Sequence, residues 1–489
     1  MNLKEFTKKF IPQFLLQRYH KILALVANFY YGFPSEKLIV IGVTGTNGKS
    51  TTAHLIAKVL EGAGFKVGAT STVGFKVAEK EWLNAKKMTM LGRFALQKLL
   101  REMVSAGCRF AVIETSSQGI EQFRHLGVNY DAAVFTNLTP EHIEAHGGFE
   151  NYKKAKGKLF AHLTAKPRKI IDGKVVPKVS VVNADDEHAE YFGQFKADEK
   201  YGYGLKLKTQ NSKLKTTTQN LKLVEATNME LGSLGARFMI HNSRFILHLF
   251  GEFNVYNALA TVCVGLSQGL SLEAIARGLE KIRGIPGRME FIDEGQNFHV
   301  LIDHAPEPAS MRQLYKTIHD LKFQTLLTGR QVPNSKIIHV LGSAGGGRDK
   351  KRRPILGQLA AENADYVIIT NEDPYDEDPL AIIDEVAMGA TAPLTPLRSA
   401  QGIILSPEQA NAVSASKADV PKKEGVNLFK ILDRGEAIAK ALSLAEEGDL
   451  VVITGKGSEQ AICVANNKKI PWDDREKVRE LLKQLTIDN

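Results

Sequence analysis

The residues best suited to chemistry in this 489-residue chain form one glycine-rich segment, residues 45–51. It lies where an apolar run, residues 38–43, gives way to a helix-forming stretch, residues 49–62. Backbone N–H groups of such a loop, together with the following helix N-terminus, bind phosphate oxygens. The usual pattern would place glycine at position 43, where this chain has Val43, so the loop is a variant form. The segment predicts a nucleoside triphosphate site made by Gly45, Thr46, Asn47, Gly48, Lys49, Ser50 and Thr51.

Two side chains of this loop and one outside it predict how the phosphates would be handled. Lys49 supplies the cation for the β- and γ-phosphates, and Ser50 supplies a hydroxyl ligand for Mg²⁺. Glu114 ends a predicted strand, residues 110–114, and carboxyl ends of parallel strands meet at one edge of a sheet. We therefore expect the Glu114 carboxylate to bind Mg²⁺ opposite the loop.

The same loop resembles that of the Mur ligase family, ATP-dependent enzymes that join a carboxylate to an amine while building peptidoglycan peptides. Further motifs follow in the family's order and extend the resemblance over about residues 37–480. The similar segments are 114–117, 137–142, 152–156, 254–257, 287–290, 346–350, 433–438 and 455–459. The resemblance implies a ligase that forms an acyl phosphate and then an amide, with release of ADP and phosphate.

The resemblance also implies roles that the residue types alone do not indicate. Glu114 and His142 would hold metal ions together with Ser50, and Lys156 would be carbamylated. Addition of CO₂ converts a lysine cation into an anionic oxygen ligand that can approach Mg²⁺. The nucleotide-binding positions implied beyond the loop are Asn254, Asn257, Arg288 and Asp303. ATP and Mg²⁺ are the expected cofactors.

Within the family, the chain is most similar to the branch that adds the third residue to a UDP-N-acetylmuramoyl dipeptide. The implied substrate-binding residues are Thr89, Ser116, Arg348, Glu372, Asp373, Tyr375, Gly455 and Glu459. Two alternatives remain. One is a Mur-like ligase for another acid, such as a polyglutamate, a folate-like compound or a different cell-wall peptide. The other is a non-catalytic scaffold that binds nucleotide.

The incoming amine is expected to be a diamino acid. Members that add diaminopimelate carry an arginine where this chain has Tyr375, and a phenol cannot replace a planar guanidinium fork. The carboxylates of Glu372, Asp373, Asp376 and Glu459 would favour a cationic side-chain terminus over an anionic one. The sequence therefore predicts lysine or ornithine in preference to meso-diaminopimelate.

Alternating apolar strands and amphipathic helices predict an α/β fold that positions these residues. We expect a helical segment over 1–36, a central parallel-sheet ATPase domain over 37–285 and a Rossmann-like domain over 286–489. Few residues precede Gly45, so the family's usual N-terminal UDP-binding domain is expected to be missing or shortened. Residues 1–36 read as a helix packed on the next domain, with contact to a membrane surface as the alternative.

Composition excludes several other classes of protein. No apolar run approaches the roughly 18 residues that a membrane span needs, and the first residues lack a secretory signal. Cys108, Cys263 and Cys463 stand far apart, which favours a reducing cytoplasm over a disulfide framework or a zinc site. The net charge of +10 is scattered without a nucleic-acid signature. It favours phosphate-bearing substrates.

Overall fold

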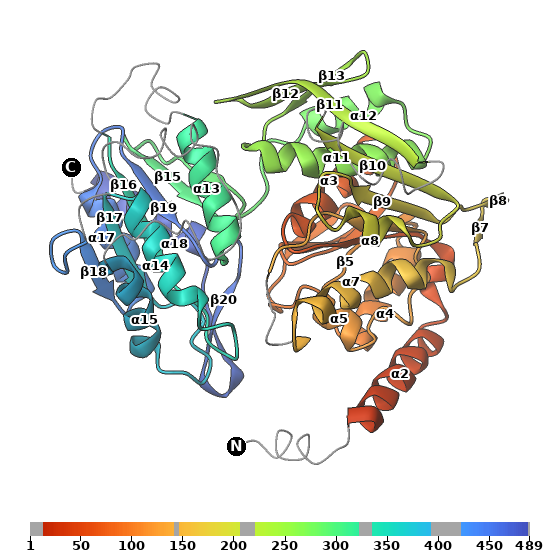
Figure 1. Cartoon of the computed structure of the whole chain (residues 1–489), viewed down its shortest axis with the longest axis horizontal. Coiled ribbons are helices and arrows are strands. Elements are labelled where there is room, and N and C mark those ends of the chain that lie inside the picture. Colours follow the sequence, from red (N-terminus) through yellow and green to blue (C-terminus); the bar gives the residue numbers. More distant parts are fainter. Residues whose placement is uncertain (1–12, 141–145, 206–220, 322–334, 393–421, 488–489) are drawn as a thin grey trace. The chain divides into compact units, whose positions relative to one another are not determined.

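The structure, a computed structural model, describes residues 13–140, 146–205, 221–321, 335–392 and 422–487. The chain divides into two compact units, Met1–Arg283 and Gly284–Asn489, and both are drawn in Figure 1. The predicted boundaries after residues 36 and 285 stay predictions. Each unit is built on its own β-sheet. Among the described residues, no helix is long and apolar enough to cross a membrane.

The first unit is centred on five parallel strands that run in the order β9-β6-β1-β5-β2. Nearly all of their residues are buried, as expected for parallel strands with helices on both faces. Val43 pairs with Glu114, which brings the end of β5 beside the segment that follows β1. The strands are β1 (Ile39–Thr44), β2 (Val67–Thr70), β5 (Phe110–Glu114), β6 (Ala132–Phe135) and β9 (Val179–Asn183).

Helices cover both faces of this sheet. One core cluster joins alternate strand residues, such as Val40, Ile113 and Phe135, to α4, α5, α7 and α8. The opposite face carries α3, α11 and α12, as Figure 1 shows. The bounds are α3 (Lys49–Gly62), α4 (Arg93–Ser105), α5 (Ser117–Glu121), α7 (Phe149–Thr164), α8 (Ala189–Gly193), α11 (Glu252–Ser267) and α12 (Leu272–Glu280).

Further strands extend the sheet at both edges, to eleven within the described residues. On one side, β3 and β4 continue from β2 in antiparallel pairs. On the other side, β10 and β11 continue the parallel pairing from β9, and β12 and β13 then pair antiparallel. These strands are β3 (Gly74–Val77), β4 (Lys80–Leu83), β10 (Glu199–Leu205), β11 (Leu221–Gly232), β12 (Gly235–Ile240) and β13 (Ser243–Leu247). Outside the sheet lie α2 (Gln13–Tyr30), the 3₁₀ turn η1 (Pro34–Lys37) and the hairpin β7–β8 (Ile170–Ile171, Lys174–Val175).

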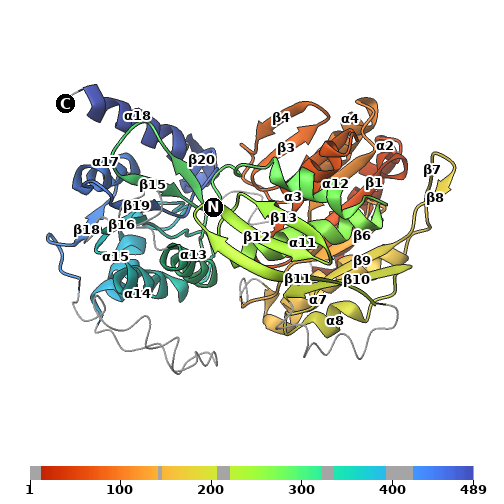
Figure 2. The ribbon, with the colours of Figure 1, turned by 90° about the horizontal axis from the view of Figure 1, so that it is seen from above.

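The second unit contains a sheet with the order β14-β15-β19-β16-β17-β18, parallel except for β14. A core cluster packs α17 and α18 on one face, and α13, α14 and α15 cover the other (Figure 2). The strands are β14 (Glu290–Ile292), β15 (His299–Ile302), β16 (Ile337–Leu341), β17 (Tyr366–Thr370), β18 (Leu428–Ile431) and β19 (Leu450–Ile453).

The remaining elements of the second unit complete a Rossmann-like arrangement. They are α13 (Pro308–Asp320), α14 (Arg352–Asn363), α15 (Pro379–Thr391), α17 (Arg434–Leu444), α18 (Asp474–Ile487), the 3₁₀ turn η3 (Ala465–Asn467) and the hairpin β20–β21 (Ala461–Val464, Lys468–Pro471). The predicted α/β class, with a helical N-terminal segment, is confirmed.

Candidate active site

The predicted phosphate loop connects β1 to α3. Gly45 has φ 153° and Gly48 has φ 81°, backbone conformations that side chains rarely adopt. A Cβ atom on Gly45 would lie 1.8 Å from Thr136 Oγ1, and one on Gly48 would lie 2.4 Å from Asn257 Oδ1. Both positions therefore require glycine, and the loop follows a tight path that leaves the start of α3 available to an anion.

The end of β6 holds this loop in shape. Asn137 accepts a hydrogen bond from Asn47 N at 2.8 Å through Oδ1, and its carbonyl oxygen accepts Thr46 N at 2.8 Å. Thr136 Oγ1 donates to the carbonyl oxygen of Asn47 at 2.7 Å. Thr136 and Asn137 were not among the predicted site residues. Their position just after the strand that neighbours β1 is the signal that could have found them.

Two lysine ammonium groups lie against the loop. Lys49 Nζ donates to the carbonyl oxygen of Thr46 at 2.6 Å, so its charge stays beside the loop. Lys156 reaches the loop from α7 and donates to the carbonyl oxygen of Gly45 at 2.6 Å. Its side chain is almost wholly buried, with Nζ 4.4 Å from the centroid of the Tyr152 ring. A lysine buried at this place is not the solvated surface charge that a helical lysine usually is.

Glu114 occupies the predicted place at the carboxyl end of β5. Its side chain is buried, and Oε2 accepts hydrogen bonds from Ser50 Oγ at 2.8 Å and Thr72 N at 2.7 Å. Thr72 Oγ1 lies 3.2 Å from Glu114 Oε1 and 3.1 Å from Thr89 Oγ1. The structure thus brings Ser50, Glu114 and Thr89 together. Thr72, which joins them, was missed, although it lies just after strand β2.

The donor set around Glu114 fits Mg²⁺. Hydroxyl and carboxylate oxygens are the hard ligands that Mg²⁺ prefers, and the ion keeps waters and phosphate oxygens as its other ligands. No group of three His, Cys, Asp or Glu side chains suited to a metal occurs in the described ranges. One carboxylate with one hydroxyl, beside a phosphate loop, is consistent with an ion that arrives with its nucleotide. His142 lies outside the described residues.

The predicted adenine-side residues are next to the phosphate loop. Asn257 Oδ1 accepts a hydrogen bond from Thr52 Oγ1 at 3.1 Å, which ties α11 to the first turn of α3. Asn257 Nδ2 donates to Asn254 Oδ1 at 3.0 Å, and Asn254 Nδ2 donates to the carbonyl oxygen of Phe250 at 2.8 Å. The two side-chain amides therefore form a buried pair, and the Asn257 amide packs against Gly48.

Ser116 has a structural contact in the first unit. It is the N-cap of α5, where its Oγ accepts Gly119 N at 3.1 Å. The adjacent Ser117 Oγ lies 3.1 Å from His146 Nε2. His146 follows the undescribed segment that contains His142, and it was not predicted as a site residue.

In the second unit, Asp303 lies at the carboxyl end of β15. Its carboxylate accepts Met289 N at 2.7 Å and Ala305 N at 2.9 Å. Burial raises the pKa of this carboxyl group, and the charge of Arg288 opposes that rise. Gly287, with φ 63°, packs against the segment after β19, since a Cβ there would lie 2.0 Å from Ser458 N. Asp303, at the end of β15, therefore lies close to Arg288, since it accepts a hydrogen bond from the next residue, Met289.

Lys456 organises the acidic residues of the second unit. Its buried Nζ donates to Asp373 Oδ1 and Glu459 Oε2, each at 2.9 Å, and to the carbonyl oxygen of Ala461 at 2.7 Å. Asp373 Oδ1 also accepts Cys463 N at 2.7 Å. Two of the carboxylates predicted to attract a cationic substrate therefore already pair with an internal lysine, whose charge offsets one of theirs. Lys456 itself was missed, although it is the lysine of the motif at 455–459.

Glu372 and Tyr375 lie in the same loop cluster. Glu372 is buried against Gly455, and burial raises the pKa of its carboxyl group against the opposing charge of Arg352. Tyr375 has φ 52°, and its N–H donates to the carbonyl oxygen of Cys463 at 3.0 Å. Its ring covers Gly346, where a Cβ would lie 2.6 Å from the ring. The exposed Arg348 follows in that glycine-rich loop.

Comparison with known proteins is consistent with this geometry. The Mur ligase middle domain matches residues 43–265, and the Mur ligase glutamate ligase domain matches residues 287–457. A UDP-N-acetylmuramoyl-L-alanyl-D-glutamate–2,6-diaminopimelate ligase of Geobacillus kaustophilus is 34% identical over 97% of this chain and 85% of its own length. A UDP-N-acetylmuramyl-tripeptide synthetase of Roseiflexus sp. is 34% identical over 97% of this chain and 84% of its own.

Solved structures show the same fold. A diaminopimelate ligase of the same description as the Geobacillus protein superposes with a TM-score of 0.54 at 27% identity, over 95% of this chain and 83% of that chain. A folylpolyglutamate synthase of Mycobacterium tuberculosis superposes with a TM-score of 0.59 at 16% identity, over 89% and 92% of the two chains, a likeness of fold alone. Because both domain models match in order and the two relatives are 34% identical over nearly the whole chain, the chain belongs to the Mur ligase family of ATP-dependent, ADP-forming acid–amino-acid ligases.

Proposed function

We propose that this ligase adds the third residue, a diamino acid, to UDP-N-acetylmuramoyl-L-alanyl-D-glutamate during peptidoglycan synthesis. The observation that carries the proposal is 34% identity, over nearly the whole chain, to two relatives named for this step. Both the phosphate loop and the Ser50–Glu114 pair are built as that chemistry needs. The use of ATP and of a UDP-linked precursor supports a cytoplasmic location, which we include in the proposal.

In the first unit, different residues are proposed to bind the phosphates and the metal ion during phosphoryl transfer. The loop N–H groups and Lys49 bind the β- and γ-phosphates and stabilise the charge that develops as the γ-phosphoryl group moves to the substrate carboxylate. Mg²⁺, held by Ser50 and Glu114, supplies further charge stabilisation at those oxygens when bound. The amine then attacks the acyl carbon of the acyl phosphate, which forms the amide and releases phosphate. In the first unit, Asn254 and Asn257 are proposed to bind the nucleotide. Arg288 and Asp303 are proposed as nucleotide-binding residues of the second unit.

Lys156 is proposed to act as a carbamate and not as a free ammonium group. Its Nζ is buried within hydrogen-bond distance of the phosphate loop, so a carbamate oxygen there would lie beside the bound phosphates and their cation. His142 is proposed as a further metal ligand.

The amine subsite is proposed to lie around Tyr375, Arg348 and the 455–459 segment. Because Lys456 pairs with both Asp373 and Glu459, it offsets one of their two negative charges, which weakens the charge argument for lysine or ornithine. Tyr375 is therefore the residue we propose to separate lysine or ornithine from diaminopimelate. Thr89 and Ser116 are proposed to contact the UDP-linked acid.

The test is phosphate release by the purified chain with ATP and Mg²⁺, in the presence of both an acid and an amine. UDP-N-acetylmuramoyl-L-alanyl-D-glutamate with a panel of diamino acids is expected to give turnover that requires both substrates. Turnover with a folate or polyglutamate acid instead would support the alternative ligase. Nucleotide binding without turnover on any pair would support the scaffold alternative.

A further inference from the structure

The outer face of α2 carries large apolar side chains that nothing in the described part of the chain covers. Leu15, Tyr19, Ile22, Val26 and Phe29 follow one another at intervals of three or four residues, which places them on one face of the helix. Their exposed fractions lie between 45% and 72%. We call these five residues the outer stripe.

The inner face of α2 has the opposite character. Ala24, Ala27 and Asn28 are buried, and the helix approaches so closely that a Cβ on Gly127 would lie 2.8 Å from the carbonyl oxygen of Ala24. Small residues thus attach α2 to its unit while the large apolar ones point away. Contiguous exposed apolar surface of this kind marks a binding site for a partner or a membrane.

The charge along α2 has a single sign. Residues 13–33 contain no Asp or Glu, whereas Arg18 and Lys21 are exposed beside the outer stripe. Two more exposed aromatic rings follow the stripe, Tyr30 at the last residue of α2 and Phe33 just beyond it. Apolar and aromatic residues on one side with cations beside them are typical of a helix that lies in the interface of a membrane with anionic lipids.

A second exposed apolar element belongs to the same unit. The β7–β8 hairpin projects from the edge of the unit in Figure 1. Ile170 and Val175 on it are 72% and 60% exposed, and Asp172 and Lys174 lie between them in the sequence. Asp172 forms an ion pair with Arg109, which leaves the charge of Lys174 uncompensated within the hairpin. The hairpin thus repeats, on a smaller scale, the combination of exposed apolar side chains and a cation.

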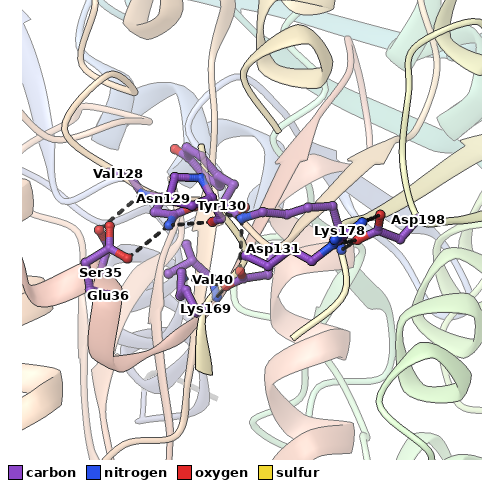
Figure 3. A network of polar contacts seen from close by, with 12 residues as sticks. Ser35, Glu36, Val40, Val128, Asn129, Tyr130, Asp131, Lys169, Lys178 and Asp198 are labelled. Atoms are coloured by element: carbon purple, nitrogen blue, oxygen red, sulfur yellow. Dashed lines mark hydrogen bonds and ion pairs between the residues drawn. The ribbon is translucent and has the colours of Figure 1, made fainter. Parts of the chain in front are cut away.

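A buried polar network joins the segment that follows α2 and the base of the hairpin to the end of the sheet at which β1 and β6 begin (Figure 3). Asn129 N donates to Ser35 Oγ at 3.1 Å, and Asn129 Nδ2 donates to Glu36 Oε2 at 3.0 Å, which fixes the chain between α2 and β1. Lys169, at the root of the hairpin, donates to the carbonyl oxygen of Leu38 at 2.7 Å and to Asp131 Oδ2 at 2.5 Å.

The network lies at the end of the sheet where strands β1 and β6 begin. The phosphate loop lies at the other end, where β1 finishes. A partner bound to α2 and the hairpin would therefore leave the nucleotide site open to solvent, because that site is at the opposite end of the same strands. Neither Lys169 nor Asp131 has a role in the proposed chemistry, so the network can serve to hold the hairpin and the turn after α2 in place.

We propose that the outer stripe of α2, with the tip of the β7–β8 hairpin, binds the surface of an anionic lipid bilayer and holds the ligase at the membrane interface. A bilayer rich in phosphatidylglycerol complements Arg18, Lys21 and Lys174. A second copy of the chain is the less suitable occupant, because a twofold contact would bring two helices together whose charges are all positive. The binding is peripheral, since no described helix is able to span a bilayer.

The test is co-sedimentation of the full chain with vesicles. Vesicles of equal parts phosphatidylglycerol and phosphatidylcholine are expected to bind the protein in a salt-sensitive manner, and pure phosphatidylcholine vesicles much more weakly. The double variant Ile22→Ser/Phe29→Ser is expected to weaken binding roughly a hundredfold, because each side chain loses its burial in the interface. Arg18→Gln and Lys21→Gln are each expected to weaken it about fivefold.

Leu234→Ser is the matched control, because Leu234 is 71% exposed on the turn between β11 and β12, away from the proposed surface. It should bind vesicles as the unchanged chain does, and all variants should keep the ligase activity measured without lipid. Equal binding to both kinds of vesicle, no binding, or unchanged binding by the double variant would overturn the proposal. So would a dimer by light scattering that the double variant loses while vesicles have no effect.

Discussion

Ser50 and Glu114 are 64 residues apart in sequence, yet the Ser50 hydroxyl donates to Glu114 Oε2 across 2.8 Å. The contact joins the first turn of α3, which directly follows the phosphate loop, to the end of β5. It exists because β1 and β5 are neighbouring parallel strands, with Val43 paired to Glu114.

Glu114→Gln is predicted to raise the Mg²⁺ concentration needed for half-maximal phosphate release by about tenfold or more, because a neutral amide binds a hard cation poorly. The amide oxygen can still accept the bonds from Ser50 and Thr72, so the fold should survive. Glu121→Gln, at an exposed carboxylate paired with Lys158, is the control. An unchanged Mg²⁺ requirement in Glu114→Gln would show that the carboxylate is not a metal ligand.

Lys49→Ala is predicted to lower turnover by at least roughly a hundredfold with little change in the melting temperature. Loss of a charge contact made in the transition state typically costs about 3 kcal/mol. Lys58→Ala on the same helix removes only surface ion pairs to Glu61 and Glu81 and should be nearly neutral for turnover. Near-normal turnover in Lys49→Ala would contradict the assignment of the loop.

Lys156→Ala is predicted to be almost inactive and to regain part of its activity when a short carboxylate such as acetate is added. The added anion would occupy the place of the carbamate oxygens. Lys158→Ala, two residues along the same helix and exposed, should keep its activity and gain nothing from acetate. A crystal with nucleotide and Mg²⁺ that shows an unmodified Lys156 amine would argue against carbamylation.

The ratio kcat/KM for lysine, ornithine and meso-diaminopimelate, measured with one acceptor acid, is predicted to favour the first two. Tyr375→Arg should shift the preference towards diaminopimelate, since a guanidinium fork binds its distal carboxylate. Tyr375→Phe keeps the ring that packs on Gly346 and should leave the order unchanged. A clear preference for diaminopimelate in the unchanged chain would contradict the role proposed for Tyr375.

The network of Figure 3 predicts that two substitutions lower stability by very different amounts. Asp131 is the carboxylate that both Lys169 and Lys178 contact in a buried place. Asp131→Asn should lower the free energy of unfolding by about 3–5 kcal/mol, because two ammonium groups would stay buried without their counter-charge. Lys169→Met leaves one balanced Asp131–Lys178 pair and should cost far less. Chemical denaturation of the two variants measures both values.

The pH dependence of stability follows from the same lysine. Burial, opposed by the Asp131 charge, lowers the pKa of Lys169 to about 8. Between pH 8 and the normal lysine pKa, about 10.4, the unfolded chain binds one proton more than the folded chain. The contribution of Lys169 to stability therefore rises with pH across that window. The difference in unfolding free energy between the unchanged chain and Lys169→Met should change over this range and stay flat below pH 8.

The residues of the phosphate loop were predictable because their signal is local. A buried strand, two glycines and a Lys-Ser pair at the start of a helix specify a phosphate loop within one short segment, whatever lies around it. Glu114 was predictable for a related reason, since the end of a parallel strand has a known position relative to the end of its neighbour. The alternation of strands and helices likewise determined the α/β class.

Contacts between distant segments were decided by the tertiary structure alone. Thr72, Asn137 and Lys456 each have at least one partner in the site that is 42 or more residues away. No spacing in the sequence indicates which strand ends lie side by side or which carboxylates a buried lysine pairs with. The exposure of the outer stripe on α2 has the same origin. The sequence determines that the helix has an apolar face, but only packing decides that its small residues turn inward and its large ones face solvent.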